Sequence, residues 1–512
     1  MSDGLHTVGR WVRDRALSTP ARVAVDDRGV GVTYAELDAR SQRLAAALTA
    51  AGYGVGDRIA TLTGNSADHV VLLFACAKAG LVLAPLSWRL SPREIAAQLD
   101  HADPALLVVE PEFDALADAA VERAARCVPR TASGAGGVEV AVPERGNARD
   151  GAPRDVVRRP VEDEDPLLLL FTSGTLGRPR AALLSHANCF WTNLSLSRTV
   201  DLTGQDVVLQ VLPQFHVAGW NVQPLLAWWV GATVVLERTF DPGRALRLVA
   251  EKRVSTMMGV PTNYLLLAEH PDFARTDLSS LRQALVGGAP MPEPLLRTWH
   301  RRGVALLQGY GLTEASPNVL CLPAEDARRM VGYAGTPYPH VDVAVADPAT
   351  GRLLDGPARG ELLVRGPGVF IGYWRDPEAT AEAMRGGWLH TGDLVERDAA
   401  GYHRVVDRLT DVYISGGENI APAEVEQVLY RHPGVAEAAV VGVPDPRWGE
   451  VGQAFVVRRP GVAVDEEALL AHCRAELARF KVPHRVVFVD ALPRSAVDKV
   501  LKRELRARAE AP

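Results

Sequence analysis

Short apolar runs alternate with amphipathic stretches through the first part of the chain, and this alternation restricts the possible folds more than any other feature. Each run has the length of a buried strand, and each following stretch has apolar residues at helical spacing. The runs are 58–62, 81–85 and 106–109, and the stretches that follow them are 66–79, 91–101 and 114–126. Because strands that return in the parallel sense need a crossover helix, the pattern predicts parallel sheets covered by helices.

The alternation resumes after a stretch of different character. Residues 130–160 are rich in Gly, Ala, Pro and Arg without periodicity, which is typical of an exposed loop. Further strands are expected at 206–212, 233–236, 256–259, 283–286 and 305–309. Several of these runs end in Gly or Pro, where a ligand can approach the backbone.

The last part of the chain predicts a separate unit. Runs 361–365 and 405–408 are typical of antiparallel strands, and a further change follows Asp411. Beyond it, helices are expected at 422–432 and 466–479, and strands at 436–442, 453–458 and 485–489. We therefore expect an α/β protein with a large N-terminal domain of βαβ-type sheets and a β-rich subdomain over 1–409, and a small α+β domain over 410–512.

The bulk composition excludes several classes of protein. With 512 residues, 47% hydrophobic and 23% charged, the chain is long enough for a large core and more than one domain. The net charge of −6 gives no basic surplus for a nucleic-acid backbone, although a local basic cluster can still meet a small anion. The most apolar stretch, 222–236, is too short to span a bilayer, so no transmembrane segment is expected.

Cysteine usage and the N-terminal residues bear on the compartment. The five cysteines are scattered without paired spacing, so neither a disulfide framework nor a structural zinc site is expected. Charged residues between Asp3 and Asp14 precede any apolar run, which argues against a signal peptide. We therefore expect a protein of the reducing cytoplasm.

One stretch predicts chemistry as well as structure. The apolar run 166–171 gives way at 172–180 to hydroxyls, two glycines, a proline and two arginines. Small residues expose backbone N–H groups, hydroxyls add donors, and the arginines add positive charge. These are the parts of a polyphosphate site, although a solvated glycine turn has a similar composition.

Four further clusters follow in order along the chain. Segment 309–314, Gly-Tyr-Gly-Leu-Thr-Glu, offers an aromatic face, a hydroxyl and a carboxylate, which suit a nucleotide and its magnesium ion. Segment 388–393 ends in Asp393 after a tight turn, where the carboxylate can accept hydrogen bonds from ribose hydroxyls. Segment 415–419 is a glycine turn, and segment 493–499 ends in Lys499. Each cluster alone is a weak indication, whereas five in this order are a strong one.

In order and spacing these segments resemble the adenylate-forming superfamily, which includes acyl-CoA synthetases, firefly luciferase and the adenylation domains of peptide synthetases. Segments 212–216, 287–290 and 443–449 look most like the bacterial fatty-acyl and aryl CoA ligases. The resemblance implies that ATP and Mg²⁺ convert a small aromatic or fatty carboxylic acid to an acyl-adenylate, and that coenzyme A then takes the acyl group. It also implies that the small domain is mobile and rotates about Thr410 between the two half-reactions.

The resemblance assigns roles to individual residues. Lys499 and Thr313 would contact the α-phosphate, Glu314 would bind Mg²⁺, and His216 would lie between the acid and the thiol tunnel, with a buried structural histidine as the alternative. The implied ATP contacts are Thr172, Ser173, Gly174, Thr175, Gly177 and Arg180 at the phosphates, Gly288, Ala289, Pro290 and Tyr310 at the adenine with Gly309 and Gly311 beside them, and Asp393 and Arg408 at the ribose. The implied coenzyme A contacts are Arg89, Gly416, Gly417, Trp448, Lys481 and Arg485, and the implied acid contacts are Val217, Trp220, Val286, Gly287 and Asn318.

Lysine is scarce in this chain, because only five of its 56 basic residues are lysines. A lysine near a chain end is most often a solvated surface residue. The segment before Lys499 and the scarcity of lysine elsewhere favour a catalytic role, since a planar guanidinium does not replace a compact ammonium.

Four positions depart from the family's usual pattern. Leu176 stands where a second threonine is common, Arg180 replaces lysine, Asp498 replaces glycine, and Thr410 replaces a charged hinge residue. Leu176 removes one hydroxyl, which weakens phosphate binding by about 1 kcal/mol. The neutral hinge leaves other acceptors open, namely the thiol of a carrier protein, an amine or another small nucleophile. A catalytically dead binding module is a further alternative, against which the retained Glu314, Asp393, Arg408 and Lys499 argue.

Overall fold

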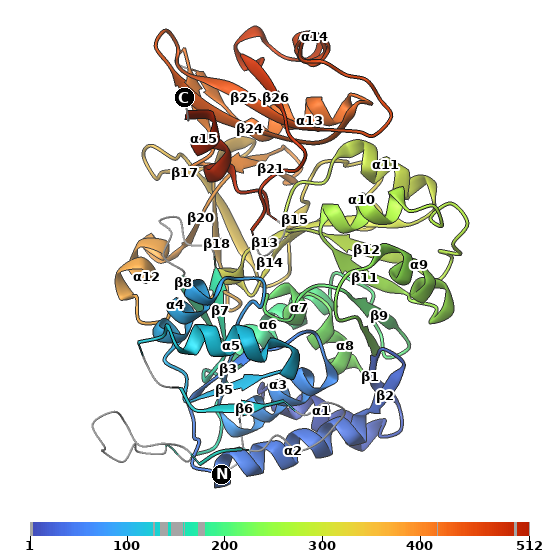
Figure 1. The fold of residues 1–512 in the computed structure, drawn as a ribbon, viewed down its shortest axis with the longest axis vertical. Coiled ribbons are helices and arrows are strands. Elements are labelled where there is room, and N and C mark those ends of the chain that lie inside the picture. Colours follow the sequence, from blue (N-terminus) through green and yellow to red (C-terminus); the bar gives the residue numbers. More distant parts are fainter. Residues whose placement is uncertain are drawn as a thin grey trace.

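The computed structural model describes residues 4–125, 128–133, 142–144, 157, 159–172, 180–416, 418–495 and 499–510. Two large sheets, a smaller antiparallel sheet and a C-terminal sheet make up the molecule, with the C-terminal elements gathered at one end (Figure 1). The mixed α/β class and the division into a large N-terminal and a small C-terminal domain are those predicted from the sequence.

A seven-stranded sheet contains the first three predicted strands. Its order is β19 (Gly372–Tyr373), β8 (Arg180–Ser185), β7 (Pro166–Thr172), β4 (Val82–Pro85), β3 (Arg58–Leu62), β5 (Leu106–Val109) and β6 (Arg130–Ala132). β3 pairs in parallel with both β4 and β5, as the crossover helices require. β7 and β8 are antiparallel and pair Thr172 with Arg180, so the predicted phosphate loop connects two adjacent strands.

A nine-stranded sheet holds the strands expected beyond residue 200. Its order is β15 (Thr336–Pro337), β14 (Asn318–Cys321), β13 (Ala305–Gly311), β12 (Gln283–Val286), β11 (Thr256–Gly259), β9 (Val207–Gln210), β10 (Thr233–Leu236), β1 (Val23–Asp27) and β2 (Val30–Thr33). The run from β13 to β1 is parallel, so its carboxyl ends meet along one edge, where ligands of open α/β sheets bind.

Helices cover these sheets, and their ends follow local sequence. α3 begins after Ser66, whose hydroxyl accepts a hydrogen bond from the backbone of His69, and ends at Gly80 in the left-handed region. The helices of the large domain are α1 (Gly9–Ser18), α2 (Tyr34–Ala50), α3 (Ala67–Ala79), α4 (Pro92–Ala102), α5 (Asp114–Val121), α6 (His186–Ser197), α7 (Ala218–Asn221), α8 (Pro224–Val230), α9 (Pro242–Glu251), α10 (Pro261–Glu269), α11 (Glu293–Arg301) and α12 (Pro377–Ala383).

The two faces of the nine-stranded sheet belong to different hydrophobic cores. Leu285 of β12 packs in the main core, with Trp220 and Val217, whereas its neighbour Val286 packs in a second core with Tyr264 and other residues of α9 to α11. The alternation of side chains along a strand therefore separates the two cores.

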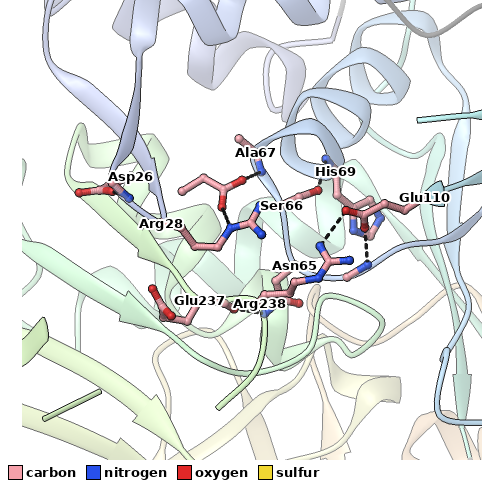
Figure 2. Close-up of polar contacts among 12 residues, drawn as sticks. Asp26, Arg28, Asn65, Ser66, Ala67, His69, Glu110, Glu237 and Arg238 are labelled. Atoms are coloured by element: carbon pink, nitrogen blue, oxygen red, sulfur yellow. Dashed lines mark hydrogen bonds and ion pairs between the residues drawn. The ribbon is translucent and has the colours of Figure 1, made fainter. Parts of the chain in front are cut away.

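Charged and amide side chains fasten the two large sheets at their seam (Figure 2). Arg238 Nη1 donates to Glu110 Oε1 over 2.7 Å, joining the segment after β10 to the segment after β5. Asn65 Nδ2, before α3, donates to the carbonyls of Leu212 (2.9 Å) and Glu237 (3.0 Å) of the other sheet. Asn65 is buried and these bonds satisfy its amide, so they hold the two sheets together at this point.

The remaining sheets carry the C-terminal half. An antiparallel sheet has the order β17 (Leu353–Leu354), β16 (Asp342–Ala346), β18 (Ala358–Arg365), β20 (Leu389–Arg397) and β21 (His403–Arg408). The C-terminal sheet comprises β23 (Glu418–Ile420), β22 (Tyr413–Ser415), β25 (Gly449–Arg458), β24 (Val435–Asp445) and β26 (Arg485–Phe488), with helices α13 (Pro422–Arg431), α14 (Glu466–Glu476) and α15 (Lys502–Glu510). Residues from Tyr413 onward form hydrophobic cores of their own.

The structure corrects two expectations about the N-terminal half. The helix expected over 114–126 ends at Val121, where turns follow. Residues 130–132, expected in an exposed loop, form β6 in parallel with β5. Their short sequence, Arg-Thr-Ala, has too few residues to show a period, and its strand conformation comes from pairing with β5. No helix among the described residues is long and apolar enough to cross a membrane.

Candidate active site

The expected nucleotide site lies where β13 leaves the nine-stranded sheet. A Cβ on Gly287 would lie 3.2 Å from the carbonyl oxygen of Gly309, so the segment after β12 runs directly beside the end of β13. Gly288 has φ +79°, and Gly288, Ala289 and Pro290 are exposed. A Cβ on Gly311 would collide with the carbonyl of Pro317, so only glycine fits there. The structure thus brings together the segments predicted to surround the adenine.

The predicted phosphate loop is described only at its two ends. Thr172 Oγ1 donates to the carbonyl of Arg180 over 3.4 Å across the β7–β8 pair. Ser173, Gly174, Thr175, Leu176 and Gly177 lie outside the described residues.

Asp393 connects the end of β13 to β21. Tyr310 Oη donates to Asp393 Oδ2 over 2.5 Å, and Arg408 Nε lies 3.2 Å from Asp393 Oδ1. Asp393 is buried, and burial raises the pKa of its carboxyl while Arg408 opposes that shift. Arg408 in turn has a raised pKa, chiefly because of Asp393. The carboxylate is therefore held by two partners from separate strands, in the position expected for the ribose.

Lys499 reaches this cluster from the C-terminal domain. Its backbone is fixed by Ser495, whose N–H donates to the Lys499 carbonyl over 2.8 Å and whose Oγ accepts from the Lys499 N–H over 3.3 Å. The residue is accessible to solvent, yet the protein that surrounds its ammonium lowers the pKa of that group, and the charge of Arg408 adds to the effect. Asp393 and Glu314 act in the opposite direction. Lys499 therefore faces the residues predicted to hold the nucleotide.

His216 approaches the same cluster from the loop after β9. Its Nε2 is buried and has no hydrogen-bond partner in the described part of the chain. Burial lowers the pKa of the imidazole to about 3, and the charges of Lys499 and Arg89 contribute. Gln214, two residues earlier, donates its backbone N–H to Asn65 Oδ1 over 2.8 Å, so the sheet seam holds this loop. His216 is thus a neutral ring beside the expected reaction centre.

Glu314 follows β13 in a short 3-10 helix, Thr313–Ala315. In the described part of the chain, the hydrogen bond to its carboxylate comes from Tyr373, whose Oη lies 2.7 Å from Oε1. A carboxylate with one oxygen free of protein donors suits Mg²⁺, which usually takes one or two carboxylates together with substrate phosphates. No group of three or more His, Cys, Asp or Glu side chains able to hold a metal occurs among the described residues. Tyr373 was not recognised from the sequence, because it lies 59 residues from Glu314 along the chain.

The expected acid-binding residues fall into two groups. Val217 and Trp220 belong to the main core, and the Trp220 ring lies edge-on to His69 with centroids 5.1 Å apart. Asn318, on β14, donates to Thr192 Oγ1 over 3.1 Å. Gly287 is buried beside Gly309, whereas the structure places Val286 in the second core, away from Val217 and Trp220.

The expected coenzyme A residues are dispersed. Gly416 has φ +59°, and a Cβ there would lie 3.0 Å from the Trp448 ring, which is 41% exposed. Lys481 Nζ pairs with Glu424 at 2.7 Å, and Arg485 is exposed on β26. Arg89 stacks on Trp88 and Phe215, at 5.2 and 6.0 Å from the ring centroids, near His216. The structure thus brings Gly416 and Trp448 together but not the three cations, and Gly417 lies outside the described residues.

Comparison with known proteins identifies the family. The model of the AMP-binding enzymes matches residues 12–374, and the model of the AMP-binding enzyme C-terminal domain matches residues 424–499. Feruloyl-CoA synthase from an Amycolatopsis species is 44% identical over 98% of this chain and 99% of its own, and indoleacetate–CoA ligase from Aromatoleum aromaticum is 38% identical over 98% and 97%. The crystal structure of ATP-bound MatB from Rhodopseudomonas palustris superposes with a TM-score of 0.88 at 34% identity, covering 99% of both chains. The chain belongs to the AMP-binding enzymes of the adenylate-forming superfamily.

Proposed function

We propose that this protein is an AMP-forming acid–thiol ligase. An acid carboxylate attacks the α-phosphate of ATP, pyrophosphate leaves, and the sulfur of coenzyme A then displaces AMP from the acyl-adenylate to give an acyl-CoA. The observation that carries the proposal is the convergence of Lys499 with Asp393, Arg408 and Glu314, which comes from four separate segments. The feruloyl-CoA and indoleacetate–CoA relatives support the same reaction.

Each residue of the site has its own role in the first half-reaction. Lys499 places a compact positive charge where negative charge gathers on the attacking carboxylate and the α-phosphate. Asp393, held by Tyr310 and Arg408, accepts hydrogen bonds from the ribose hydroxyls. Thr313 and Arg180 would contact the phosphates, and Glu314 would hold Mg²⁺. When bound, that ion neutralises the charge on the phosphate oxygens.

The acid is an aromatic carboxylic acid in this proposal. Feruloyl and indoleacetyl groups both carry a planar ring, and those two relatives match nearly the whole chain. We expect the buried, apolar Val217 and Trp220, together with Gly287, to border such a ring near His216. Asn318 is held by Thr192 and would border the same site.

The second half-reaction requires the small domain, over 410–512, to turn about Thr410. In the present orientation Arg506 Nη2 lies 2.9 Å from Asp411 Oδ1, which holds α15 against the residue after the hinge. After the turn, Gly416 and Trp448 would line the path of the thiol. We propose that the enzyme works in the cytoplasm, where ATP and coenzyme A are available and the four described cysteines, all free, stay reduced.

Acid-dependent exchange of pyrophosphate into ATP tests the first half-reaction. Ferulate and indoleacetate should each support exchange above that of a fatty acid such as palmitate, and coenzyme A should then yield the corresponding acyl-CoA. Exchange without an acyl-CoA product would assign a different acceptor. The absence of exchange with any of a panel of carboxylic acids would refute the proposed activity.

A further inference from the structure

Tyr373 stands between two groups of opposite charge that the reaction needs. Its Oη donates to Glu314 Oε1 over 2.7 Å, while the guanidinium carbon of Arg180 lies 5.2 Å from the centroid of its ring. Arg180 ends the predicted phosphate loop, and Glu314 is the proposed metal ligand. One phenol therefore contacts both the cation meant for phosphate and the carboxylate meant for Mg²⁺.

The backbone around Tyr373 is fixed on both sides. β19 pairs Tyr373 with Ala182 of β8, two residues beyond Arg180, and the Trp374 N–H donates to the Ala181 carbonyl over 2.7 Å. On the other side, the Phe370 N–H donates to the backbone carbonyl of Glu314 over 2.9 Å. Because both attachments are backbone hydrogen bonds, the backbone of Tyr373 cannot shift without moving the strand that carries Arg180 or the turn that carries Glu314.

The arrangement keeps Arg180 and Glu314 from neutralising each other. In the described part of the chain the ion-pair partner of Arg180 is Glu382, at 3.8 Å, whose side chain is 67% exposed and provides only a weak interaction. Arg180 and Glu314 are both half-buried, so a direct pair between them would be screened less by solvent than the pair with Glu382, and it would occupy both groups. The aromatic ring accepts the guanidinium on its face, and its hydroxyl presents a neutral donor to the carboxylate.

We propose that Tyr373 is a positioning residue that orients the Glu314 carboxylate for Mg²⁺ and separates it from Arg180. The inference rests on the proposed function, because it concerns the metal and the triphosphate of that reaction. A partner in the second coordination shell typically changes metal affinity by about 10- to 100-fold when it is removed.

Tyr373→Phe tests the hydroxyl, and Tyr402→Phe is the matched control. Tyr402 also donates to a carboxylate, that of Asp326, but in a different part of the large domain. Mg²⁺ is titrated calorimetrically into enzyme saturated with α,β-methylene ATP, an analogue that cannot release pyrophosphate. The midpoint, which is the Mg²⁺ concentration at half-saturation, should be about tenfold higher for Tyr373→Phe than for the wild type. Tyr402→Phe should leave the midpoint at the wild-type value, and the maximal exchange rate of Tyr373→Phe at saturating Mg²⁺ should stay near that of the wild type.

Tyr373→Ser tests the separation of charges, because it removes the ring as well. Its Mg²⁺ midpoint should rise further, and adding Arg180→Gln to Tyr373→Ser should lower the midpoint again by releasing Glu314. A rise with Tyr373→Phe no greater than with Tyr402→Phe, or a further rise in the double variant, would overturn the inference. If wild-type enzyme does not bind the analogue in a Mg²⁺-dependent way, the proposed function fails instead.

Discussion

Replacing Lys499 with alanine should separate the two half-reactions. The side chain comes from the C-terminal domain and is accessible to solvent, so alanine removes the charge and leaves the core intact. We expect the first half-reaction, adenylation, to be lost. We expect transfer of the acyl group from a pre-made acyl-adenylate to coenzyme A to persist, because in the proposed reaction that step follows rotation of the small domain.

The size of the loss follows from the neighbouring charges. Arg408, which also influences the Lys499 ammonium, lies 3.2 Å from Asp393 and is engaged by that carboxylate, so it cannot take the place of Lys499. Removing one preorganised group that stabilises transition-state charge lowers the rate by about 10²- to 10³-fold. Lys499→Ala should therefore slow acid-dependent ATP–pyrophosphate exchange by at least that factor.

The assay needs a matched lysine variant. Lys252 pairs with Asp26 at 2.7 Å, on β1 at the other end of the nine-stranded sheet, so Lys252→Ala removes a paired lysine without touching the site. That variant should exchange at the wild-type rate. Exchange by Lys499→Ala within a factor of about ten of wild type would refute the reasoning, since it would remove most of the expected effect.

The pH profile gives an independent check on Lys499. Protein around the ammonium and the charge of Arg408 lower its pKa below the usual 10.5. Because lysine is charged below its pKa, kcat/KM for ATP should fall as pH rises through this lowered value, earlier than for an ordinary lysine. The guanidinium of Lys499→Arg keeps its charge at high pH. We expect this variant to react more slowly than the wild type, but its kcat/KM should not decline at alkaline pH.

Other variants probe the remaining parts of the site. Asp393→Asn should raise the KM for ATP about 10- to 100-fold, because hydrogen bonds to a charged group are worth about 1.5–3 kcal/mol, while the KM for the acid changes little in the same steady-state assay. Gly416→Ala places a Cβ 3.0 Å from Trp448 at φ +59°, so we expect slower acyl transfer from a pre-made adenylate and unchanged pyrophosphate exchange. Because burial lowers the pKa of His216 to about 3, His216→Gln should leave the acidic limb of the exchange profile between pH 5 and 8 unchanged while raising the KM for the acid.

The sequence predicted those elements whose pattern is local. The strands at 58–62 and 106–109 match β3 and β5 at both ends, because each apolar run has the length of a buried strand. β6 was not predictable, since its strand conformation depends on β5 rather than on its own three residues. Helix 114–126 was predicted too long because alanine-rich sequence continues beyond the last helical turn.

In the candidate site too, individual residues were predictable from the sequence, whereas contacts between distant segments were not. Asp393 and Arg408 were expected together from the sequence, but the tight turn expected before Asp393 is an irregularity within strand β20. The hydrogen bond from Tyr310 to Asp393 became evident only when the end of β13 was placed beside β20. The alternation of Leu285 and Val286 along β12 assigns them to opposite cores, which the resemblance alone did not reveal. Tyr373 required the pairing of β19 with β8, and no short segment of sequence specifies that pairing.

Two exposed ion pairs join the large domain to the small domain. Arg459 pairs with Glu269 at 2.9 Å and Arg431 with Glu293 at 3.6 Å, and all four side chains are a third or more exposed. Such exposed pairs contribute about 0–1 kcal/mol each and weaken with added salt. These two pairs therefore contribute little to the orientation proposed for adenylation, whereas the pair between Lys502 and Asp407 at 4.0 Å is less exposed. We expect added salt to weaken the two exposed pairs and so to shift the balance between the two half-reactions without altering any group that touches a substrate.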